Sequence, residues 1–260
     1  MRPEQKAVER SQEQIQANKL FKKITRKAGT TLRDHKMIAE GDRILVGLSG
    51  GKDSMILLKV LAERRAAMPF DFHLEAAHVE APGIGYRIDH SKLEEFCQAL
   101  NIPLHFREIE PDLEKDPSKT ACFICSWNRR KELFTLGREL DCNKLALGHH
   151  RMDALETLLM NMIYHGSVSS LPYTLEMFDG RVELIRPLMD LDERLLEEYA
   201  TLSGLLKVEK SCPHEDRTKR ERMAQLIKEI ESIHGPGPFN MFKSMDKIFE
   251  EYLPGKAKPD

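Results

Sequence analysis

The residues best suited to chemistry form the hexapeptide Ser49-Gly-Gly-Lys-Asp-Ser54. An apolar segment at 43–48, which predicts a strand, precedes it, and an apolar segment from Met55, which predicts a helix, follows it. Gly50 and Gly51 allow close approach of the backbone to a ligand, and a helix start offers unpaired N–H groups at the positive end of its dipole. The hexapeptide therefore predicts a cradle for the β and γ phosphates of ATP. Its further phosphate donors are Ser49, Lys52 and Ser54.

The spacing is not that of a Walker A loop, because Asp53 follows the lysine where that loop needs serine or threonine. Hydrolysis of the γ-phosphate is therefore disfavoured. The hexapeptide instead resembles the PP-loop of the N-type ATP pyrophosphatases, whose members cut ATP between the α and β phosphates and adenylate a substrate oxygen. A glycine-rich turn without a ligand is the alternative, but all six motif residues fall together at a strand-to-helix junction.

A second element, Leu145-Ala-Leu-Gly-His-His-Arg-Met-Asp-Ala-Leu-Glu-Thr157, follows another predicted strand. Members of the same family carry a Gly-His pair and two acidic residues at this place. The resemblance implies that Gly148 lets the adenine or ribose approach the strand. It also implies that Asp153 holds Mg²⁺ against the phosphates, since this ion prefers oxygen ligands. Packing roles are the alternative for His149 and His150.

One departure from the family pattern concerns this metal site. Met152 stands where relatives usually have the first of two aspartates. Either metal binding then depends on Asp53 and Glu156, or the activity is altered. Two residues at the ends of the first two predicted strands complete the predicted nucleotide site: Leu48 and His78.

Five cysteines, an odd number, argue against a disulfide framework and favour metal or redox use. Cys122 and Cys125 form a CxxC pair at the start of a predicted helix, where the helix dipole lowers a thiol pKa. With Cys212 they make a candidate three-cysteine site. Thiolates suit iron–sulfur clusters and zinc alike, His214 would be a fourth zinc ligand, and a metal-free persulfide-forming pair is the third alternative. Two cysteines in apolar contexts are interpreted as ordinary buried residues: Cys97 and Cys142.

Four stretches together resemble one branch of the family, the tRNA 2-thiocytidine synthetases (TtcA-like proteins), from about residue 18 to about residue 248. They are Met37–Ser54, the cysteine pair with Arg129-Arg130, Leu147–Arg151 and Ile185-Arg-Pro187. Members of this type carry a 4Fe-4S cluster on three cysteines, with one iron open to bind sulfide. The resemblance places that cluster on Cys122, Cys125 and Cys212.

The resemblance implies ATP-dependent tRNA thiolation in two steps. A base carbonyl oxygen first attacks the α-phosphate of ATP, while Lys52 and Mg²⁺ stabilise the departing pyrophosphate. Sulfur held at the cluster then attacks the same carbon and displaces AMP. The resemblance also implies a cytidine in the anticodon loop as the target, a sulfur donor such as a cysteine desulfurase, and a homodimer. The predicted catalytic residues are Lys52, Asp53, Asp153, Cys122 and Cys125.

Three other functions stay open. A thiolase that makes 2-thiouridine would share every motif. A PP-loop enzyme that amidates or lyses a small molecule would lack the three cysteines, so it explains them poorly. A nucleotide-binding or regulatory protein with lost catalysis would explain Met152.

Basic residues supply candidate contacts to tRNA phosphates in a chain whose formal net charge is only −2. One cluster lies in the polar, helix-prone N-terminal segment, where a solvated helix face is the alternative. Another follows the cysteine pair, and a third spans 217–222. A base is reached only where it is unpaired or flipped out of its stack, so a tRNA loop fits as substrate. The predicted tRNA-binding residues are Lys22, Lys23, Arg26, Lys27, Arg129 and Arg130.

Short apolar runs alternate with longer amphipathic segments from Arg43 onward, which predicts an α/β fold with a doubly wound, parallel, five-stranded sheet. Such sheets bind ligands beyond the carboxyl ends of their strands, where the strand order reverses. The loops after Leu48, Val79 and Leu147 are therefore the expected site. We expect strands at about 43–48, 72–79, 103–108, 144–148 and 182–186, and helices at about 53–66, 87–100, 123–140 and 153–165.

Further helical patterns lie near 190–203, 216–233 and 240–252. The predicted organisation is a basic helical arm at 1–40, a PP-loop ATP pyrophosphatase domain at 41–190, a helical C-terminal appendage at 191–253 that carries Cys212, and a flexible tail at 254–260. With 41% hydrophobic and 32% charged residues, the chain is neither disordered nor uniformly basic. No run approaches the roughly 20 apolar residues that cross a bilayer. No signal-peptide core is present at the start, so the expected location is the cytoplasm.

Overall fold

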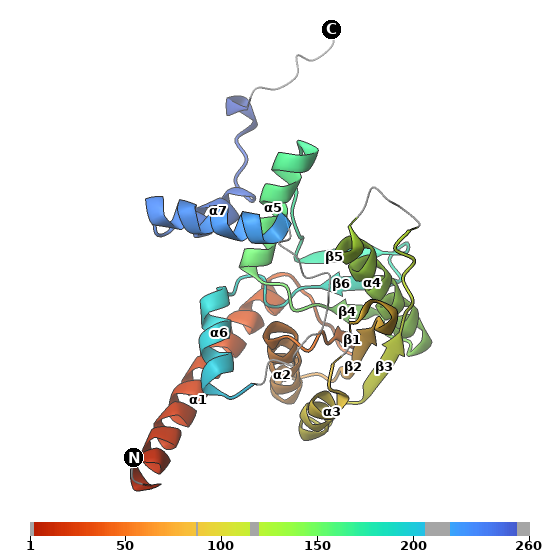
Figure 1. Ribbon diagram of the computed structural model, residues 1–260, viewed down its shortest axis with the longest axis vertical. Helices are drawn as coiled ribbons and strands as arrows, with labels where there is room; N and C mark the ends of the chain where they lie inside the picture. Colours follow the sequence, from red (N-terminus) through yellow and green to blue (C-terminus); the bar gives the residue numbers. More distant parts are fainter. Residues whose placement is uncertain (1–2, 87, 115–119, 206–218, 254–260) are drawn as a thin grey trace. The chain divides into compact units, whose positions relative to one another are not determined.

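The computed structural model describes residues 3–86, 88–114, 120–205 and 219–253, with the backbone alone for residues 3–11. The chain divides into two compact units. The first contains the chain up to Arg151 and the segment Pro172–Asp216, and the second contains Met152–Leu171 and the chain from Arg217 onward. All the strands of the described residues belong to the first unit (Figure 1).

The strands form one sheet in the order β3-β2-β1-β4-β6-β5 (Figure 1). Their bounds are Arg43–Gly47 for β1, His73–Glu80 for β2, Leu104–Glu108 for β3, Lys144–Ala146 for β4, Thr174–Met177 for β5 and Val182–Ile185 for β6. Central β1 pairs in parallel with β2 and β4, so that Val46 lies opposite Ala76 and Ala146. β3 and β6 continue the parallel pairing, whereas β5 runs antiparallel to β6 at the edge.

In the residues that the structure describes the sheet has six strands, so the expected count of five was wrong. The five expected strands are all present, and β5 is the addition. Leu175 and Glu176 of β5 are exposed, and its end residues are only partly buried, so the strand lacks the apolar alternation that predicts strands. It forms because three successive residues with positive φ, Phe178, Asp179 and Gly180, turn the chain back onto β6.

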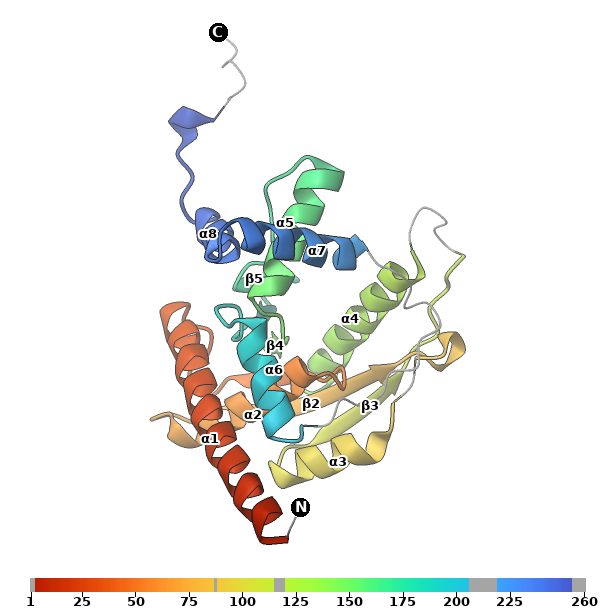
Figure 2. The same ribbon diagram turned by 60° about the vertical axis from the view of Figure 1, so that its left-hand side comes forward.

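Helices cover both faces of the sheet, which confirms the doubly wound α/β class (Figure 2). Ile44 and Val46 of β1 belong to one hydrophobic cluster, while Leu45 between them belongs to another, because successive side chains of a strand point to opposite faces. The first cluster includes residues of α1 (Pro3–Asp34), α2 (Lys52–Ala67), α3 (His90–Ala99) and α6 (Glu193–Leu202). The second includes residues of α4 (Ala121–Glu139).

The N-terminal helix α1 packs one of its faces into the first unit. Ile24 and Ala28 of α1 are fully buried in the core cluster that α2 and α6 share. Lys59 Nζ of α2 donates to the Tyr199 hydroxyl of α6 at 2.7 Å and lies 4.7 Å from the ring centroid of Phe21 in α1. These contacts join the three helices, whereas Lys22, Lys23 and Arg26 of α1 are exposed.

The strand order reverses between β1 and β4, because β2 and β3 lie on one side of β1 and β6 and β5 lie beyond β4. Open α/β sheets bind ligands beyond the carboxyl ends of the strands at such a point. The hexapeptide follows β1, and the Gly148-His-His segment follows β4. Both predicted site loops therefore lie at the edge where this fold places its ligand.

The second unit is helical in its described residues. It contains α5 (Arg151–His165) from Met152 onward, α7 (Lys219–Ile233), α8 (Gly237–Ser244) and a 3-10 turn at Glu250–Tyr252. The helix expected at 240–252 begins earlier, because a proline is tolerated at the first helical positions, and it already ends at Ser244. In the part of the chain that the structure describes, no helix is both long and apolar enough to cross a membrane.

Candidate active site

The hexapeptide forms a tight turn between β1 and α2. Gly50 has a φ of +75°, a conformation that side chains other than glycine rarely adopt. The Ser54 hydroxyl accepts from the Ser49 N–H at 3.1 Å and donates to the Gly51 carbonyl at 2.9 Å, so Ser54, predicted as a phosphate donor, holds the turn together. Gly51 is the N-cap of α2 and has no side chain to satisfy the first N–H groups of the helix, which therefore suit an anion.

Gly148 lies directly on this turn. A Cβ built on Gly148 would come within 2.9 Å of both the carbonyl carbon of Asp53 and the nitrogen of Ser54. That is well inside the separation at which nonbonded atoms attract. His150 Nε2 is 3.9 Å from Asp53 Oδ2. The structure therefore brings the two predicted sequence elements together, and the close approach requires glycine at position 148.

Lys52 lies between two carboxylates. Its Nζ is 3.4 Å from Asp53 Oδ2 and 3.3 Å from Glu193 Oε1, and its side chain is 13% exposed. Burial lowers the pKa of Lys52, but the attraction of Asp53 and Glu193 outweighs burial and raises the pKa above its ordinary value. The ammonium is thus charged at neutral pH. Glu193 was not predicted, because it starts α6 without belonging to any motif.

Two histidines of the predicted site have defined partners. His78 is fully buried and its Nδ1 donates to the Leu48 carbonyl at 2.7 Å, since a carbonyl oxygen only accepts. Burial lowers the pKa of His78 to about 4, so the ring is neutral. His78, predicted as a nucleotide contact, therefore fixes the strand end where the turn begins. His149 Nδ1 accepts from Arg186 Nε at 3.3 Å.

Tyr86 joins the turn to α4, and sequence reasoning missed it. Its hydroxyl donates to the Ser49 carbonyl at 3.1 Å, and the Arg129 guanidinium carbon lies 4.0 Å from its ring centroid. Arg129 Nε donates to the Val79 carbonyl at 2.9 Å. Burial raises the pKa of Tyr86, so its hydroxyl stays protonated and donates. Arg129, predicted to contact tRNA, is half-buried in these contacts.

Cys122 and Cys125 lie at the start of α4, three residues apart and therefore on neighbouring positions of the helix. The N-cap residue Thr120 accepts a hydrogen bond from the Phe123 N–H at 3.3 Å, which sets the helix start. Cys122 is partly exposed, Cys125 is buried, and neither forms a disulfide. The other predicted ligands lie outside the described residues: Cys212 and His214.

Cys97 and Cys142 are buried, as predicted. They are 1% and 4% exposed, and burial raises the pKa of each thiol to about 11. Both thiols therefore stay protonated at neutral pH. The form of cysteine that reacts and binds metals is instead the thiolate. These two cysteines contribute to packing and are set apart from the pair on α4.

Asp153 and Glu156 share a partner within the second unit. Arg220 Nη1 of α7 is 3.2 Å from Asp153 Oδ1 and 3.4 Å from Glu156 Oε2. A metal ion that binds Asp153 must therefore compete with the guanidinium. Sequence reasoning missed this pairing, because the basic 217–222 segment is assigned to tRNA phosphates. Arg217, at the start of that segment, lies outside the described residues.

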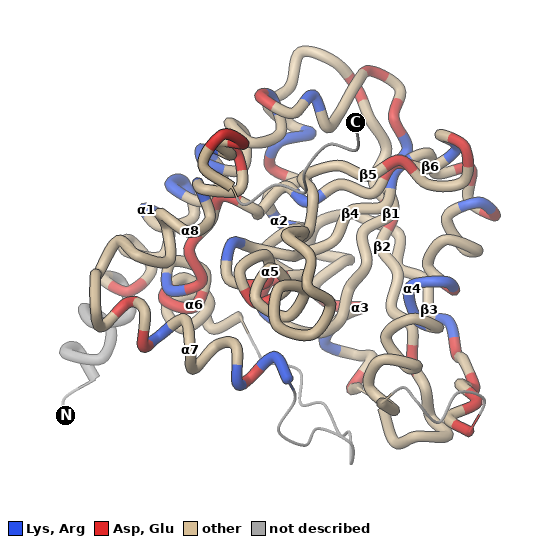
Figure 3. The backbone as a smooth tube through the Cα atoms, turned by 90° about the horizontal axis from the view of Figure 1, so that it is seen from above, with Lys and Arg blue, Asp and Glu red and all other residues tan. Residues whose placement is uncertain are grey.

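The predicted basic residues of α1 differ in exposure. Lys22, Lys23 and Arg26 are exposed, whereas Lys27 is partly buried. Burial, followed by the charges of Arg151 and Lys23, lowers the pKa of Lys27. Figure 3 marks the Lys and Arg positions along α1 and α4. Arg130 of α4 is partly buried.

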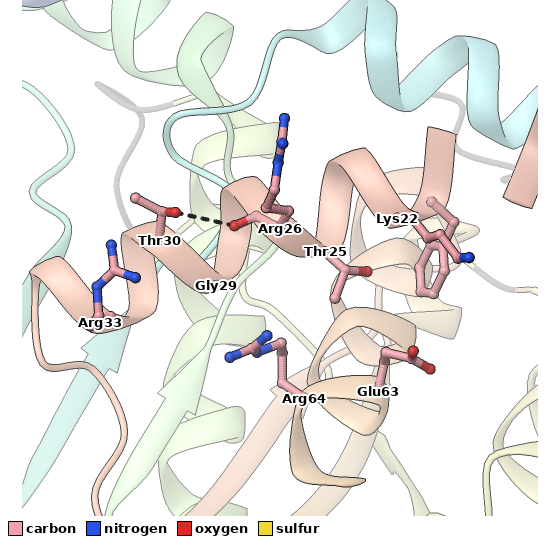
Figure 4. Close-up of a pocket in the computed structure, with 9 residues that line it drawn as sticks. Lys22, Thr25, Arg26, Gly29, Thr30, Arg33, Glu63 and Arg64 are labelled. Carbon is pink, nitrogen blue, oxygen red and sulfur yellow. Dashed lines mark hydrogen bonds between the residues drawn. The ribbon is translucent and has the colours of Figure 1, made fainter. Parts of the chain in front are cut away.

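Lys22 and Arg26 line a pocket of about 330 Å³ between α1 and α2 (Figure 4). Arg64 of α2 lies against α1 at Gly29, where an added Cβ would meet the Arg64 guanidinium carbon at 3.1 Å. The cationic lining side chains outnumber the anionic one, so the pocket suits a phosphate group. Its other charged lining residues are Arg33 and Glu63.

The turn Ser49-Gly-Gly-Lys-Asp-Ser54, at the point where a mostly parallel sheet reverses its strand order, has the sequence and position of a PP-loop. Comparison with known proteins agrees, since residues 11–230 match the PP-loop domain family. The chain is 36% identical to a tRNA-cytidine(32) 2-sulfurtransferase of Pelobacter propionicus, over 94% of this chain and 92% of that protein. A Burkholderia cenocepacia protein of the same name is 35% identical, over 93% of this chain and 74% of its own. The chain belongs to the family of the tRNA-cytidine(32) 2-sulfurtransferases.

A solved structure gives the same result for the fold. The U34-tRNA thiolase NcsA from Methanococcus maripaludis, with its [4Fe-4S] cluster, aligns with a TM-score of 0.75 and 26% sequence identity. The alignment covers 93% of this chain and 82% of that chain. The resemblance drawn from the sequence motifs is therefore confirmed at the level of family and fold.

Proposed function

We propose that the protein is an ATP-dependent tRNA thiolase that replaces a carbonyl oxygen of a base, a cytidine in the anticodon loop, with sulfur. The observation that carries the proposal is the PP-loop, closed by Gly148, in a chain 36% identical to a tRNA-cytidine(32) 2-sulfurtransferase along 94% of its length. The same name applies to the Burkholderia relative at 35% identity, which supports cytidine over uridine as the target.

The PP-loop binds the phosphates of ATP in this proposal. The N–H groups at the start of α2 and the turn at Gly50 point positive charge at an anion. The charged Lys52 exchanges its contact with Glu193 for an oxygen of the leaving pyrophosphate, and it stabilises charge where charge develops. Leu48 is held by His78, so the backbone entering the loop is fixed before ATP arrives.

A magnesium ion fits the carboxylates of the site, because Mg²⁺ demands oxygen ligands. Asp53 of the loop would hold it. The metal role predicted for Asp153, in the second unit, is a separate proposal, for which Arg220 must release that carboxylate. When bound, the ion would neutralise charge on the phosphates.

The first step forms a bond between the base carbonyl oxygen and the α-phosphorus, and it breaks the bond from that phosphorus to the oxygen bridging the α and β phosphates. Pyrophosphate leaves, and the carbonyl carbon now carries AMP, a good leaving group. In the second step a sulfide nucleophile bonds to that carbon, and AMP departs with the original carbonyl oxygen. The two steps balance without an oxidant or reductant.

The cysteine pair is proposed to serve the second step together with Cys212. Thiol groups three residues apart at a helix start fit an iron–sulfur cluster or zinc. The U34-tRNA thiolase of similar fold has a [4Fe-4S] cluster, which supports the cluster over zinc. When bound, such a cluster would supply an open iron site for sulfide.

The tRNA would contact cationic side chains of the first unit. Lys22 and Arg26 line the pocket between α1 and α2, which suits a backbone phosphate. An anticodon loop also presents unpaired bases, and an enzyme can reach a base atom only where the base is out of its stack.

A reaction with α-labelled ATP, unmodified tRNA and sulfide tests the proposal. We expect AMP and pyrophosphate, both dependent on tRNA, and 2-thiocytidine in the digested tRNA by mass spectrometry. ADP as the nucleotide product would contradict the adenylyl step. Formation of 2-thiouridine instead would show that the target is a uridine and that the protein is a thiolase of the 2-thiouridine-forming class. A Lys52→Ala control should form AMP and thiolated base at least about 100-fold more slowly.

A further inference from the structure

Two large aromatic side chains are exposed on α4, beside the cysteine pair. Phe123 is 49% exposed and Trp127 is 58% exposed. Trp127 is the only tryptophan of the chain. Burying an aromatic ring away from water is strongly favourable. Two exposed rings on one helix therefore indicate a binding surface.

The spacing places both rings on one stripe of α4. Residues four apart are neighbours on a helix surface, so Phe123 and Trp127 lie side by side along the axis. Arg130 and Lys131 follow Trp127 by three and four residues and continue the stripe with positive charge. The buried residues on the rest of the helix are Ile124, Cys125, Phe134, Leu136 and Gly137.

The charged residues of the stripe, Arg130 and Lys131, are both basic. The first turn of α4 contains no acidic residue. The acidic residues later in α4, Glu132 and Glu139, both pair with Arg107 of β3. Lys131 is exposed to solvent. The aromatic rings therefore lie next to Arg130 and next to the exposed ammonium group of Lys131.

Contacts already described hold α4 in place beside the PP-loop. Arg129 donates to the end of β2 at Val79 and lies on Tyr86, whose hydroxyl donates to Ser49 of the loop. Phe123 is adjacent in sequence to Cys122. The aromatic stripe, the cysteine pair and the loop thus belong to one connected part of the first unit.

We propose that Phe123 and Trp127 form a stacking platform, the α4 platform, for unpaired bases of the tRNA loop that presents the target base. This inference rests on the proposed function. Every base has a flat aromatic face that stacks on such rings, and phosphates flanking the stacked bases would meet Arg130 and Lys131. The neighbouring cations favour RNA over a protein partner, whose apolar contact would not need them.

Trp127 reports directly on the platform, because no other residue contributes tryptophan fluorescence. The full-length protein is titrated with unmodified tRNA while its emission and its quenching by acrylamide are followed. Filter binding gives the tRNA affinity in parallel. We expect tRNA to change the emission and to shield Trp127 from acrylamide. A fully paired RNA duplex of similar length should do so far less, since its bases are not available for stacking.

Substitutions supply the second arm of the experiment. Trp127→Ala should weaken tRNA binding about 5- to 150-fold, the range expected for losing one stacked base. Trp127→Phe should retain most of the affinity, because it keeps an aromatic face. Tyr252→Ala, which removes an aromatic side chain that is 83% exposed in the second unit, should leave affinity unchanged. Trp127 is exposed, so thermal melting of the variants should match the wild type.

Two results would overturn the platform: unchanged Trp127 emission at saturating tRNA, or wild-type tRNA affinity in Trp127→Ala. Trp127→Ala could also bind tRNA normally but lose thiolation only when a protein delivers the sulfur. That result would assign the surface to the sulfur donor and would also reject the RNA platform. Failure of the proposed function is a separate result. A wild-type protein that makes no thiolated base contradicts that function, whereas fluorescence and affinity judge the platform alone.

Discussion

Gly148→Ala is a minimal change that should impair the use of ATP by the PP-loop. The substitution adds one methyl group, and the structure defines where it goes. The new Cβ would lie 2.9 Å from the carbonyl carbon of Asp53 and the nitrogen of Ser54, and 3.0 Å from the Asp53 oxygen. All three are backbone atoms at the start of α2, so no flexible side chain can move aside.

The magnitude follows from this geometry. Ordinary contact for a Cβ begins near 3.4 Å, so the start of α2 or the end of β4 must retreat by roughly 0.5 Å. Overpacking of this kind costs about 1–3 kcal/mol of folding free energy. Misplacement of a positioning group by about 1 Å costs about 100-fold in rate. We therefore expect a drop of at least about 10-fold in kcat/KM for ATP.

The assay compares Gly148→Ala with Gly137→Ala, a matched glycine-to-alanine change in the same unit. A Cβ on Gly137 would lie 3.6 Å from Leu45 Cδ2, an ordinary contact, within α4. Alanine is favoured over glycine inside a helix by about 0.5–1 kcal/mol, so this control should be as stable as the wild type or more stable. Urea unfolding gives the free energy of each variant, and tRNA-dependent AMP formation gives its kcat/KM.

The reasoning would be refuted if Gly148→Ala matched the wild type in both ATP kinetics and unfolding. It would also be refuted if Gly137→Ala lost as much ATP-dependent activity as Gly148→Ala, because the effect would then not depend on contact with the PP-loop.

Three further predictions concern residues around the loop. Lys52→Ala should lower kcat/KM for AMP formation at least about 100-fold in steady-state kinetics. Glu193→Gln removes a carboxylate that competes for Lys52, so in the same assay it should lower the KM for ATP up to about 5-fold. Tyr86→Phe should cost about 1 kcal/mol of unfolding free energy in urea titrations and raise the KM for ATP, since Ser49 loses its hydrogen bond; an unchanged KM would exclude this positioning role. The pKa of His78 is about 4 in the folded state against an ordinary 6.5, so between these pH values only the unfolded chain binds a proton at His78. The free energy of unfolding should therefore fall by at most about 3 kcal/mol as the pH drops from 6.5 to 4. His78→Gln should flatten that slope relative to the wild type, and an equal slope in both would show that other groups cause it.

The sequence predicted the central strands because burial on both faces imposes a readable pattern. Residues 44–46 are apolar and lie between Arg43 and Gly47, and residues 145–147 are apolar and lie between Lys144 and Gly148. β5 gave no such signal, because its Leu175 and Glu176 face solvent and its pairing depends on the turn at 178–180. Local apolar pattern therefore predicts the interior of this sheet and misses its antiparallel edge.

The candidate site divides in the same way. The hexapeptide and Gly148 were predictable because their chemistry depends on residue types at fixed spacing. Tyr86 and Glu193 were not, because each is an ordinary residue whose role depends on a partner 37 or 141 positions away. Arg220 likewise meets Asp153 only through the packing of α7 within the second unit. Contacts of this kind become visible only once the chain is folded.

The most direct test of the central claim follows the carbonyl oxygen of the target base. A synthetic anticodon stem-loop whose target cytidine carries ¹⁸O at its ring carbonyl is incubated with the protein, ATP and sulfide, and the products are analysed by mass spectrometry. Adenylation of that oxygen predicts one ¹⁸O in the phosphate of each AMP and 2-thiocytidine in equal amount. AMP without the label, or thiolated base formed with ADP as the nucleotide product, would contradict the claim.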